Sequence, residues 1–147
     1  MKRVAASRAC RYKHWVVMLR PAQLTLGTLV LCCKERAESF GEISPGAFAE
    51  QKRAVMELEA TLRGLPFGAS KINYLMLMMR DPQVHYHVLP RYLEDREFDG
   101  VTFSDEPGPP VLSRVARLGG HTLAKLQRLL IDNWHIEDDG GEATPKL

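Results

Sequence analysis

The fold is decided by the stretch QVHYHVLPR, residues 83–91, which predicts a strand with one polar and one apolar face. Side chains alternate between the two faces of a strand, so Gln83, His85 and His87 share one side. The apolar residues of the other side are Val84, Tyr86 and Val88. They set the register of the strand against a core. The polar face then carries two imidazoles and an amide, with alternate Cβ atoms about 6.6–6.8 Å apart.

A histidine pair on one face of a strand suits attack on a phosphate, and it also has two plainer interpretations. The neutral ring is a nucleophile at neutral pH, because the unperturbed pKa of histidine is about 6.5. A backbone carbonyl or a carboxylate that holds the far ring nitrogen would fix the tautomer. Histidines at positions i and i+2 can also ligate zinc, although no third ligand is obvious near His85 and His87. They can equally lie on a solvated sheet face.

Three other segments predict strands of the same sheet. Residues 14–19 form a short apolar run that Arg20 and Pro21 end, and residues 28–33 are rich in β-branched and apolar side chains. We expect these two strands to pair antiparallel. Residues 72–79 predict a central strand in which methionines fill gaps in the core. Residues 80–82 return the chain to a strand over 84–89, and so short a connection requires antiparallel pairing.

Residues 44–62 predict an amphipathic helix that packs on the sheet. Ser44 is a good N-cap, and Pro45 fits the first helical position, where its missing N–H costs nothing. Apolar residues recur at helical spacing on one side, and charged residues, Glu57 among them, occupy the other. We expect the helix to end before Gly64 and its apolar residues to belong to the core.

The remaining segments predict one domain over residues 14–135, with its core in residues 15–92. Residues 93–110 are loop-like, and residues 111–118 and 123–134 predict a helical region that Gly119-Gly120 divides. Residues 1–13 predict a basic arm, either solvated or adding positive charge near a phosphate site. A transit peptide is less favoured, because the arm runs directly into a strand. Residues 136–147 predict a disordered tail.

Composition argues against several classes of protein. The 147 residues suffice for one domain with a sizeable core, and a net charge of +2 does not mark a nucleic-acid binder. No apolar run approaches the ~20 residues that a membrane span needs. Cys10, Cys32 and Cys33 are an odd count without a CxxC motif, which argues against a disulfide framework and a zinc finger. We therefore expect a reducing, cytoplasmic setting.

Residues 83–91 resemble the signature of the histidine-triad (HIT) family, His-φ-His-φ-His-φ-φ followed by a proline-containing turn. The resemblance extends along the chain in the right order. Residues 16–19 and 27–31 are similar to the family's first hairpin, residues 44–62 to its long helix, and residues 71–74 to the stretch before the triad. It covers residues 15–92, more than half of the sequence.

The resemblance implies an α+β fold, with an antiparallel sheet of about five strands, one long helix and a C-terminal helical region. It also implies a homodimer that binds purine nucleotides. In this family the middle histidine attacks the α-phosphorus of a phosphoanhydride or phosphoramidate, and a nucleotidyl-histidine is then hydrolysed or passed to an acceptor. By position, His85 is the nucleophile and His87 the third member, which contacts phosphate.

The departures from the family pattern bear on how well such a site works. Gln83 stands in the first histidine's place; it keeps a donor and an acceptor but cannot titrate. Residues 80–82 form a short turn, and Met78-Met79 stands where relatives often have Gly-Asn, so an asparagine donor to phosphate is missing. Arg20 and Arg80 are candidate replacement cations.

The resemblance also implies where the rest of the substrate lies. Met18 and Val30 stand where the family encloses the base in an apolar slot, although both are equally ordinary core residues. The leaving group is expected against the loop after Arg91 and the C-terminal region, with a contribution from across the dimer left open.

The expected function is that of a HIT hydrolase or nucleotidyl transferase acting on adenine nucleotides such as diadenosine polyphosphates. It needs no cofactor and no protein-bound metal, and a divalent metal would enter only with the substrate. No nucleic-acid or membrane partner is expected. The alternatives are a catalytically weak nucleotide-binding module of the same fold and, less favoured, a zinc-binding protein.

Overall fold

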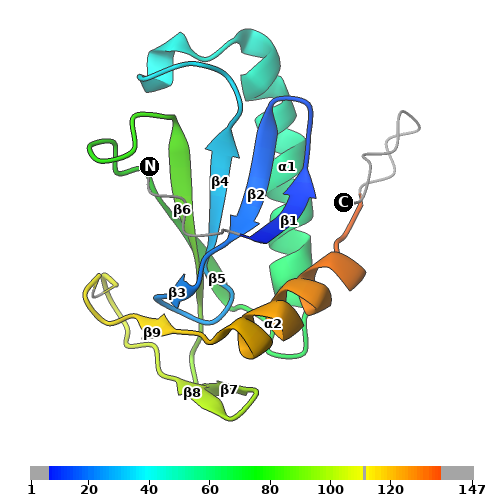
Figure 1. The fold of residues 1–147 in the computed structure, drawn as a ribbon, viewed down its shortest axis with the longest axis vertical. Helices are drawn as coiled ribbons and strands as arrows, with labels where there is room; N and C mark the ends of the chain where they lie inside the picture. Colours follow the sequence, from blue (N-terminus) through cyan, green and yellow to red (C-terminus); the bar gives the residue numbers. More distant parts are fainter. Residues whose placement is uncertain (1–6, 111, 137–147) are drawn as a thin grey trace.

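The sheet that the sequence predicts is the centre of the computed structural model, which describes residues 7–110 and 112–136 (Figure 1). In these residues the elements follow in the order β1 (Ser7–Arg11), β2 (Trp15–Leu19), β3 (Ala22–Gln23), β4 (Leu29–Cys33), η1 (Phe40–Glu42), α1 (Pro45–Gly64), β5 (Lys71–Leu75), β6 (His85–Arg91), β7 (Arg96–Phe98), β8 (Val101–Phe103), β9 (Ala116–Arg117) and α2 (Gly120–Asp132). Five strands form one antiparallel sheet in the order β1-β2-β4-β6-β5. The predicted α+β fold, with one long helix and a C-terminal helix, is confirmed.

The register of the central strands places three side chains in a row. Val30 of β4 lies opposite Met18 of β2 on one side and His87 of β6 on the other. His87 in turn lies opposite Leu75 of β5. Cys32 pairs with His85 one step further along the sheet. Both expected antiparallel pairs, β2 with β4 and β5 with β6, are present.

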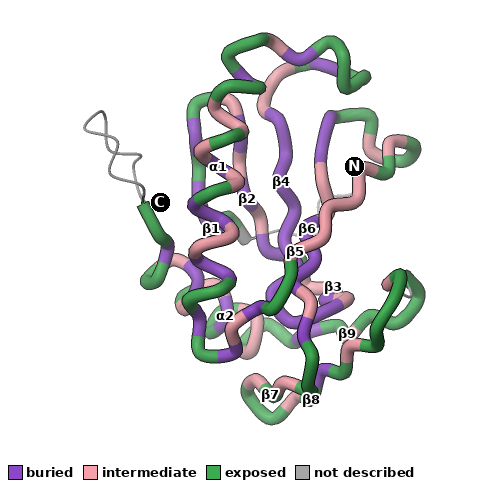
Figure 2. The backbone as a smooth tube through the Cα atoms, turned by 180° about the vertical axis from the view of Figure 1, so that it is seen from behind, coloured by how far each residue is buried: buried purple, intermediate pink, exposed green. Residues whose placement is uncertain are grey.

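One face of the sheet is packed against α1, which lies behind the strands in Figure 1 and in front of them in Figure 2. The side chains on this face alternate along each strand, and Trp15, Val17, Leu31 and Val88 are fully buried in the main core. Trp15 Nε1 also donates a hydrogen bond to the Ala47 carbonyl at 2.7 Å, which ties β2 to the first turn of α1.

Helix α1 begins as predicted and carries one buried acid that was not foreseen. Ser44 Oγ accepts a hydrogen bond from the Ala47 N–H, so it caps the helix ahead of Pro45. Glu57, expected on the solvated side, is fully buried. It accepts hydrogen bonds from Tyr12 Oη at 2.5 Å and from Arg53 Nε at 3.1 Å, which supplies the partners that a buried carboxylate needs.

Two expectations about the sheet are wrong. Part of the basic arm is β1, whose Ala9 and Cys10 are buried while Arg8 and Arg11 are exposed, so the domain does not begin at residue 14. Counting charges misses this strand because an edge strand can direct its cations to solvent. Residues 1–6 lie outside the described residues.

The strand predicted over residues 72–79 ends at Leu75, where its pairing with β6 ends at His87. Met76 and Met78 still pack beside the core, but Met79 is 90% exposed. The methionine run is therefore not the interior of a central strand.

The C-terminal third differs most from expectation. The predicted loop contains the hairpin β7–β8, whose Asp99 and Gly100 both have positive φ, as the Asp-Gly type I′ turn requires. No helix forms over residues 112–118; instead β9 pairs with β3, and residue 111 lies outside the described residues. The residues expected to divide the helical region mark its start, since Gly119 is the N-cap of α2.

At the C-terminal end, Trp134 is buried beyond α2, and its Nε1 donates to Tyr12 Oη at 3.1 Å. Of the predicted tail, only Ile136 is among the described residues. No helix in the described parts of the chain is both long and apolar enough to cross a membrane.

Candidate active site

The two histidines lie near the centre of the sheet, on the face opposite α1. Val88 of β6 belongs to the core beneath α1, and so does Val84, the residue just before the strand. The alternate residues His85 and His87 therefore point to the other face. Their rings are 5.2 Å apart between centroids and nearly perpendicular. His85 is only 5% exposed, whereas His87 is half-buried.

His85 is held in one tautomer by the backbone of its own strand. Its Nδ1 lies 2.7 Å from the carbonyl oxygen of Gln83. A carbonyl oxygen can only accept a hydrogen bond, so Nδ1 carries the proton and the neutral ring keeps a lone pair on Nε2. Nε2 is therefore the nitrogen available for attack on an electrophile.

The side chain of Gln83 makes a second contact near His85. Its side-chain Nε2 donates to the backbone carbonyl of Cys33, at the end of β4. This bond fastens the residue whose carbonyl orients His85 to the neighbouring strand. The side-chain amide of Gln83 thus ties the residues just before β6 to the end of β4.

His87 is held in the opposite tautomer by Arg20, which follows β2. Arg20 Nη1 lies 3.2 Å from His87 Nδ1. A guanidinium has only donors, so Nδ1 accepts and the ring proton is on Nε2. Burial, then the charges of Arg20 and His85, lower the pKa of His87 to about 4, while Asp81 acts in the other direction. His87 is therefore a neutral hydrogen-bond donor at neutral pH.

Of the other predicted binding residues, two lie beside the histidines and one does not. Met18 and Val30 lie beside His87 in the cross-strand row, and Val30 is 9% exposed, so they offer an apolar floor next to the Arg20 guanidinium. Arg80 is exposed on the loop between β5 and β6, and no hydrogen bond or ion pair within the described residues brings it to the histidines.

Asp81 belongs to the same loop, and sequence reasoning did not single it out. Its charge acts to raise the pKa of both His87 and Cys32, so its carboxylate lies near enough to both groups to act on them electrostatically. The one available signal was its position two residues before Gln83. Burial, the first cause, with Cys33 and Asp81, raises the pKa of Cys32 to about 11. The thiol beside His85 is therefore protonated and does not compete as a nucleophile.

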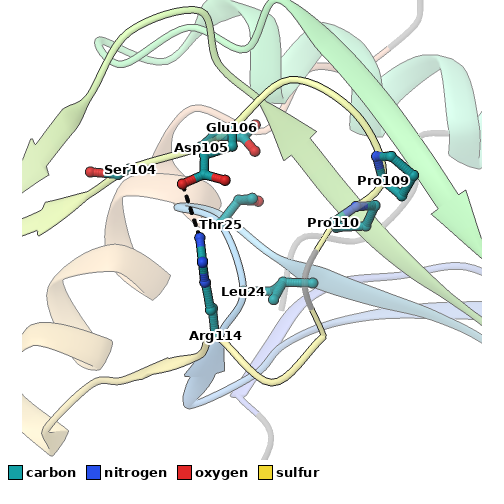
Figure 3. Close-up of a pocket in the computed structure, with 8 residues that line it drawn as sticks. All are labelled: Leu24, Thr25, Ser104, Asp105, Glu106, Pro109, Pro110 and Arg114. Atoms are coloured by element: carbon teal, nitrogen blue, oxygen red, sulfur yellow. Dashed lines mark hydrogen bonds and ion pairs between the residues drawn. The ribbon is translucent and has the colours of Figure 1, made fainter.

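A hollow of about 140 Å³ lies between the turn after β3 and the segment after β8 (Figure 3). Its lining residues are Leu24, Thr25, Ser104, Asp105, Glu106, Pro109, Pro110 and Arg114. Arg114 and Glu106 form an exposed ion pair at 3.0 Å. This is the region after Arg91 where the leaving group was expected.

Arg91, at the end of β6, anchors that segment. Its Nε and Nη2 donate to both carboxylate oxygens of Asp105, at 2.8 and 3.0 Å, and its Nη1 donates to Asn73 Oδ1 at 2.8 Å. Nη2 also donates to the carbonyls of Glu106 and Gly108, each at 2.9 Å. One partly buried guanidinium thus joins β5, β6 and the rim of the hollow.

The described residues contain no group of three or more histidine, cysteine, aspartate or glutamate side chains that could hold a metal ion. His85 and His87 give two nitrogens, and each already has one nitrogen in a hydrogen bond. A structural zinc site needs four ligands. Within the described parts of the chain, the two histidines alone would supply at most two ligands.

Solved structures of similar fold were found, whereas no family model and no curated protein matches the sequence. A histidine-triad protein from Bradyrhizobium japonicum has a TM-score of 0.69 at 13% identity, covering 88% of this chain and 91% of the other. A hypothetical histidine triad nucleotide-binding protein from Sulfolobus tokodaii has a TM-score of 0.59 at 14% identity, covering 86% and 82%. A zinc-bound histidine triad family protein from Mycobacterium smegmatis has 0.54 at 16%, covering 88% and 86%.

The chain has the histidine-triad fold. At these identities the similarity establishes the fold and leaves the chemistry to the site itself. In this fold, β6 carries His85 and His87, and Gln83 lies two residues before the first residue of the strand.

Proposed function

We propose that this chain is a HIT-type nucleotide hydrolase or nucleotidyl transferase that uses His85 as its nucleophile. The observation that carries the proposal is the bond from His85 Nδ1 to the Gln83 carbonyl, which leaves a lone pair on Nε2. A nucleophilic histidine needs this arrangement: one nitrogen held, the other free and unprotonated.

The proposed reaction has two displacement steps at the α-phosphorus of an adenine nucleotide. His85 Nε2 forms an N–P bond while the bond from phosphorus to the leaving group breaks. Water or another acceptor then attacks phosphorus and releases its proton to solvent, and the electron pair of the N–P bond returns to Nε2. The Gln83 carbonyl stabilises the cationic ring of the intermediate through Nδ1–H.

Arg20 and His87 form the phosphate-binding side of this site. The exposed guanidinium has donors left after its bond to His87, and His87 Nε2–H is a further fixed donor. Together they replace the asparagine donor that the sequence lacks. Met18 and Val30 then form an apolar slot for the base. Arg80 is retained as a second cation that reaches the phosphates only when substrate is bound.

The leaving group extends toward the hollow beside Arg114. Arg91, which anchors the rim of the hollow, is four residues beyond His87 on the same strand, about 13 Å along it. Leu24 and Thr25 of the opposite wall follow Arg20 by a few residues. Both walls are therefore continuous with the elements that hold the phosphate-binding groups.

The same proposal includes a homodimer and an intracellular setting. β5 is an edge strand, and the exposed Leu77 and Met79 follow it, so a second copy can pair there and cover them. All three cysteines are free and buried, as suits the reducing cytoplasm. No cofactor is required, and a divalent metal enters only with the substrate phosphates, on the side where Asp81 lies.

The direct test is a rapid quench of the protein with diadenosine tetraphosphate labelled in its α-phosphates. A stoichiometric, acid-labile adenylyl adduct is expected in the wild type and none in His85→Ala. If the wild type binds AMP but neither forms the adduct nor turns over, the chain is a binding module. One tightly held zinc ion per purified chain would favour the zinc-binding alternative.

A further inference from the structure

We propose that the Arg20–His87 contact restricts this site to substrates whose leaving group departs without receiving a proton. Phosphoanhydrides are then cleaved and phosphoramidates are not. The inference rests on the proposed function, because it concerns the leaving group of the same reaction.

The contact decides where the ring proton of His87 lies. Arg20 Nη1 lies 3.2 Å from His87 Nδ1, and a guanidinium can only donate there. Protonating His87 would place a second proton donor against that guanidinium and a positive charge beside another. The surroundings agree, since the pKa of His87 is lowered to about 4, first by burial and then by Arg20 and His85. Near pH 7, His87 offers only the Nε2–H of a neutral ring, which is far too weak an acid to give up its proton.

The other described groups around His87 do not replace the missing acid. His85, two residues along β6, uses its Nε2 lone pair for the attack and its Nδ1–H for the Gln83 carbonyl. Cys32 of β4 directs its Sγ to the Cys33 carbonyl at 3.5 Å, and its pKa is raised to about 11. Gln83 has no titratable group. From the loop before β6, Asp81 acts as a negative charge that raises the pKa of His87.

Leaving-group chemistry turns this arrangement into selectivity. When a phosphoanhydride is cleaved, the P–O bond breaks and its electron pair stays on the leaving phosphate, a stable oxyanion that Arg20 can stabilise. When a phosphoramidate is cleaved, the leaving nitrogen must take up a proton as the P–N bond breaks, because an amide anion is too basic to depart. A positioned general acid is worth about 10²–10⁴-fold in rate. Cleavage of the phosphoramidate at this site lacks that acceleration.

Paired substrates with one common adenylyl group test the selectivity. We expect kcat/KM for diadenosine tetraphosphate to exceed that for adenosine 5′-phosphoramidate by about 10²-fold or more at pH 7.5. Values within tenfold of each other, with the His85 adduct formed from both, would overturn this inference and leave the proposed function standing. Failure of both substrates to form the adduct would refute the proposed function itself.

Arg20→Met provides the second test, because Arg20 is exposed and its replacement leaves the core untouched. The variant should lose activity on the phosphoanhydride through its missing phosphate contact. The ratio of kcat/KM for the phosphoanhydride to kcat/KM for the phosphoramidate should be at least tenfold smaller than in the wild type. The pH optimum for cleavage of the phosphoramidate should lie in the acidic range. Arg128→Met, which removes an exposed arginine of α2, is the matched control and should keep the wild-type ratio.

A spectroscopic measurement reports on His87 without any turnover. In ¹⁵N-labelled wild type, His87 should be the Nε2–H tautomer and stay neutral until the pH approaches 4. In Arg20→Met its midpoint should move toward the ordinary histidine value of about 6.5. An Nδ1–H tautomer, or a wild-type midpoint already near 6.5, would remove the basis of the inference.

Discussion

The two faces of the sheet are built from alternate residues of the same strands, and they do different work. On the face beneath α1, Trp15 and Val88 are fully buried among apolar side chains. On the other face, Met18 and His87 are partly exposed and Arg20 is exposed. One strand register therefore serves a dry core on one side and a polar site on the other.

The difference shows how the site obtains its precision. The groups that hold His85 and His87 are the backbone carbonyl of Gln83, just before β6, and the side chain of Arg20, just after β2. Both strands are fixed by core packing on the opposite face, so the site inherits rigidity without a helix of its own. Substitutions on the two faces should therefore separate chemistry from stability.

The largest expected effect is on the site face. His85→Ala removes the proposed nucleophile, so kcat for diadenosine tetraphosphate should fall about 10³-fold or more. The core beneath α1 is unchanged, and the free energy of unfolding should fall by about 0.5–3 kcal/mol, since His85 is itself buried. Steady-state kinetics and urea unfolding measure the two quantities. The matched control is His121→Ala, an exposed histidine of α2, which should change neither; a loss of folding in His85→Ala would contradict the separation of the faces.

The next effect is on the core face, where a substitution should lower stability and leave activity unchanged. Leu58 of α1 is fully buried, so Leu58→Ala should lower the free energy of unfolding by about 2–5 kcal/mol. Activity per folded molecule should stay close to that of the wild type. Met56→Ala, at a 41% exposed position of the same helix, is the control and should cost much less. A variant that is stable but inactive would show that the two faces are coupled more tightly than the packing indicates.

What the sequence predicts correctly is what periodicity and short-range signals determine. Residues 83–91 have a period of two, which both places the strand and puts His85 and His87 on one side. The Ser44-Pro45 start and the apolar spacing that follows locate α1. These signals lie within one segment, and burial only reinforces them.

The missed elements depend on partners that are distant in the sequence. β9 exists because residues 116–117 meet β3, and α2 begins only after that pairing, so apolar content alone wrongly predicts a helix before Gly119. Residues 76–79 leave the sheet because β6 offers them no partner, although their composition suits a strand. The Asp99-Gly100 turn was a readable local signal that was not used.

The site divides in the same way. The two histidines follow from the strand pattern, whereas the Arg20–His87 bond joins residues 67 positions apart and follows only from the fold. Asp81 is near Gln83 in the sequence, but its effect on the pKa of His87 depends on where the folded loop places its carboxylate. From the sequence, one can say that the mechanism requires a fixed tautomer of each ring. The groups that fix it, the Gln83 carbonyl and Arg20, are known only from the structure.

A smaller effect is expected from the side chain that links β6 to β4. Gln83→Ala removes the donor to the Cys33 carbonyl while leaving the backbone carbonyl that holds His85. Supporting residues of this kind are typically worth about 10–100-fold, so kcat should fall by that factor with little change in KM. Gln127→Ala removes a comparable glutamine bond to the Arg8 carbonyl and is the control. An unchanged kcat would mean that core packing alone positions β6.

The smallest effect is the stability that the site face loses in acid. The pKa of His87 is about 4 in the folded chain and about 6.5 when unfolded. Between these values the unfolded chain binds a proton that the folded chain does not, so stability should fall as the pH drops from about 6.5 to 4. Above that window both states are neutral and the contribution is constant.

Urea midpoints of the wild type and His87→Gln, measured from pH 8 to 4.5, isolate this contribution from that of the carboxylates. The wild type should lose more stability than the variant below pH 6.5, and parallel curves would show that His87 is not held neutral by the fold. The variant leaves the α1 face intact, so any divergence between the curves comes from the site. The divergence measures how strongly the folded structure disfavours protonation of His87.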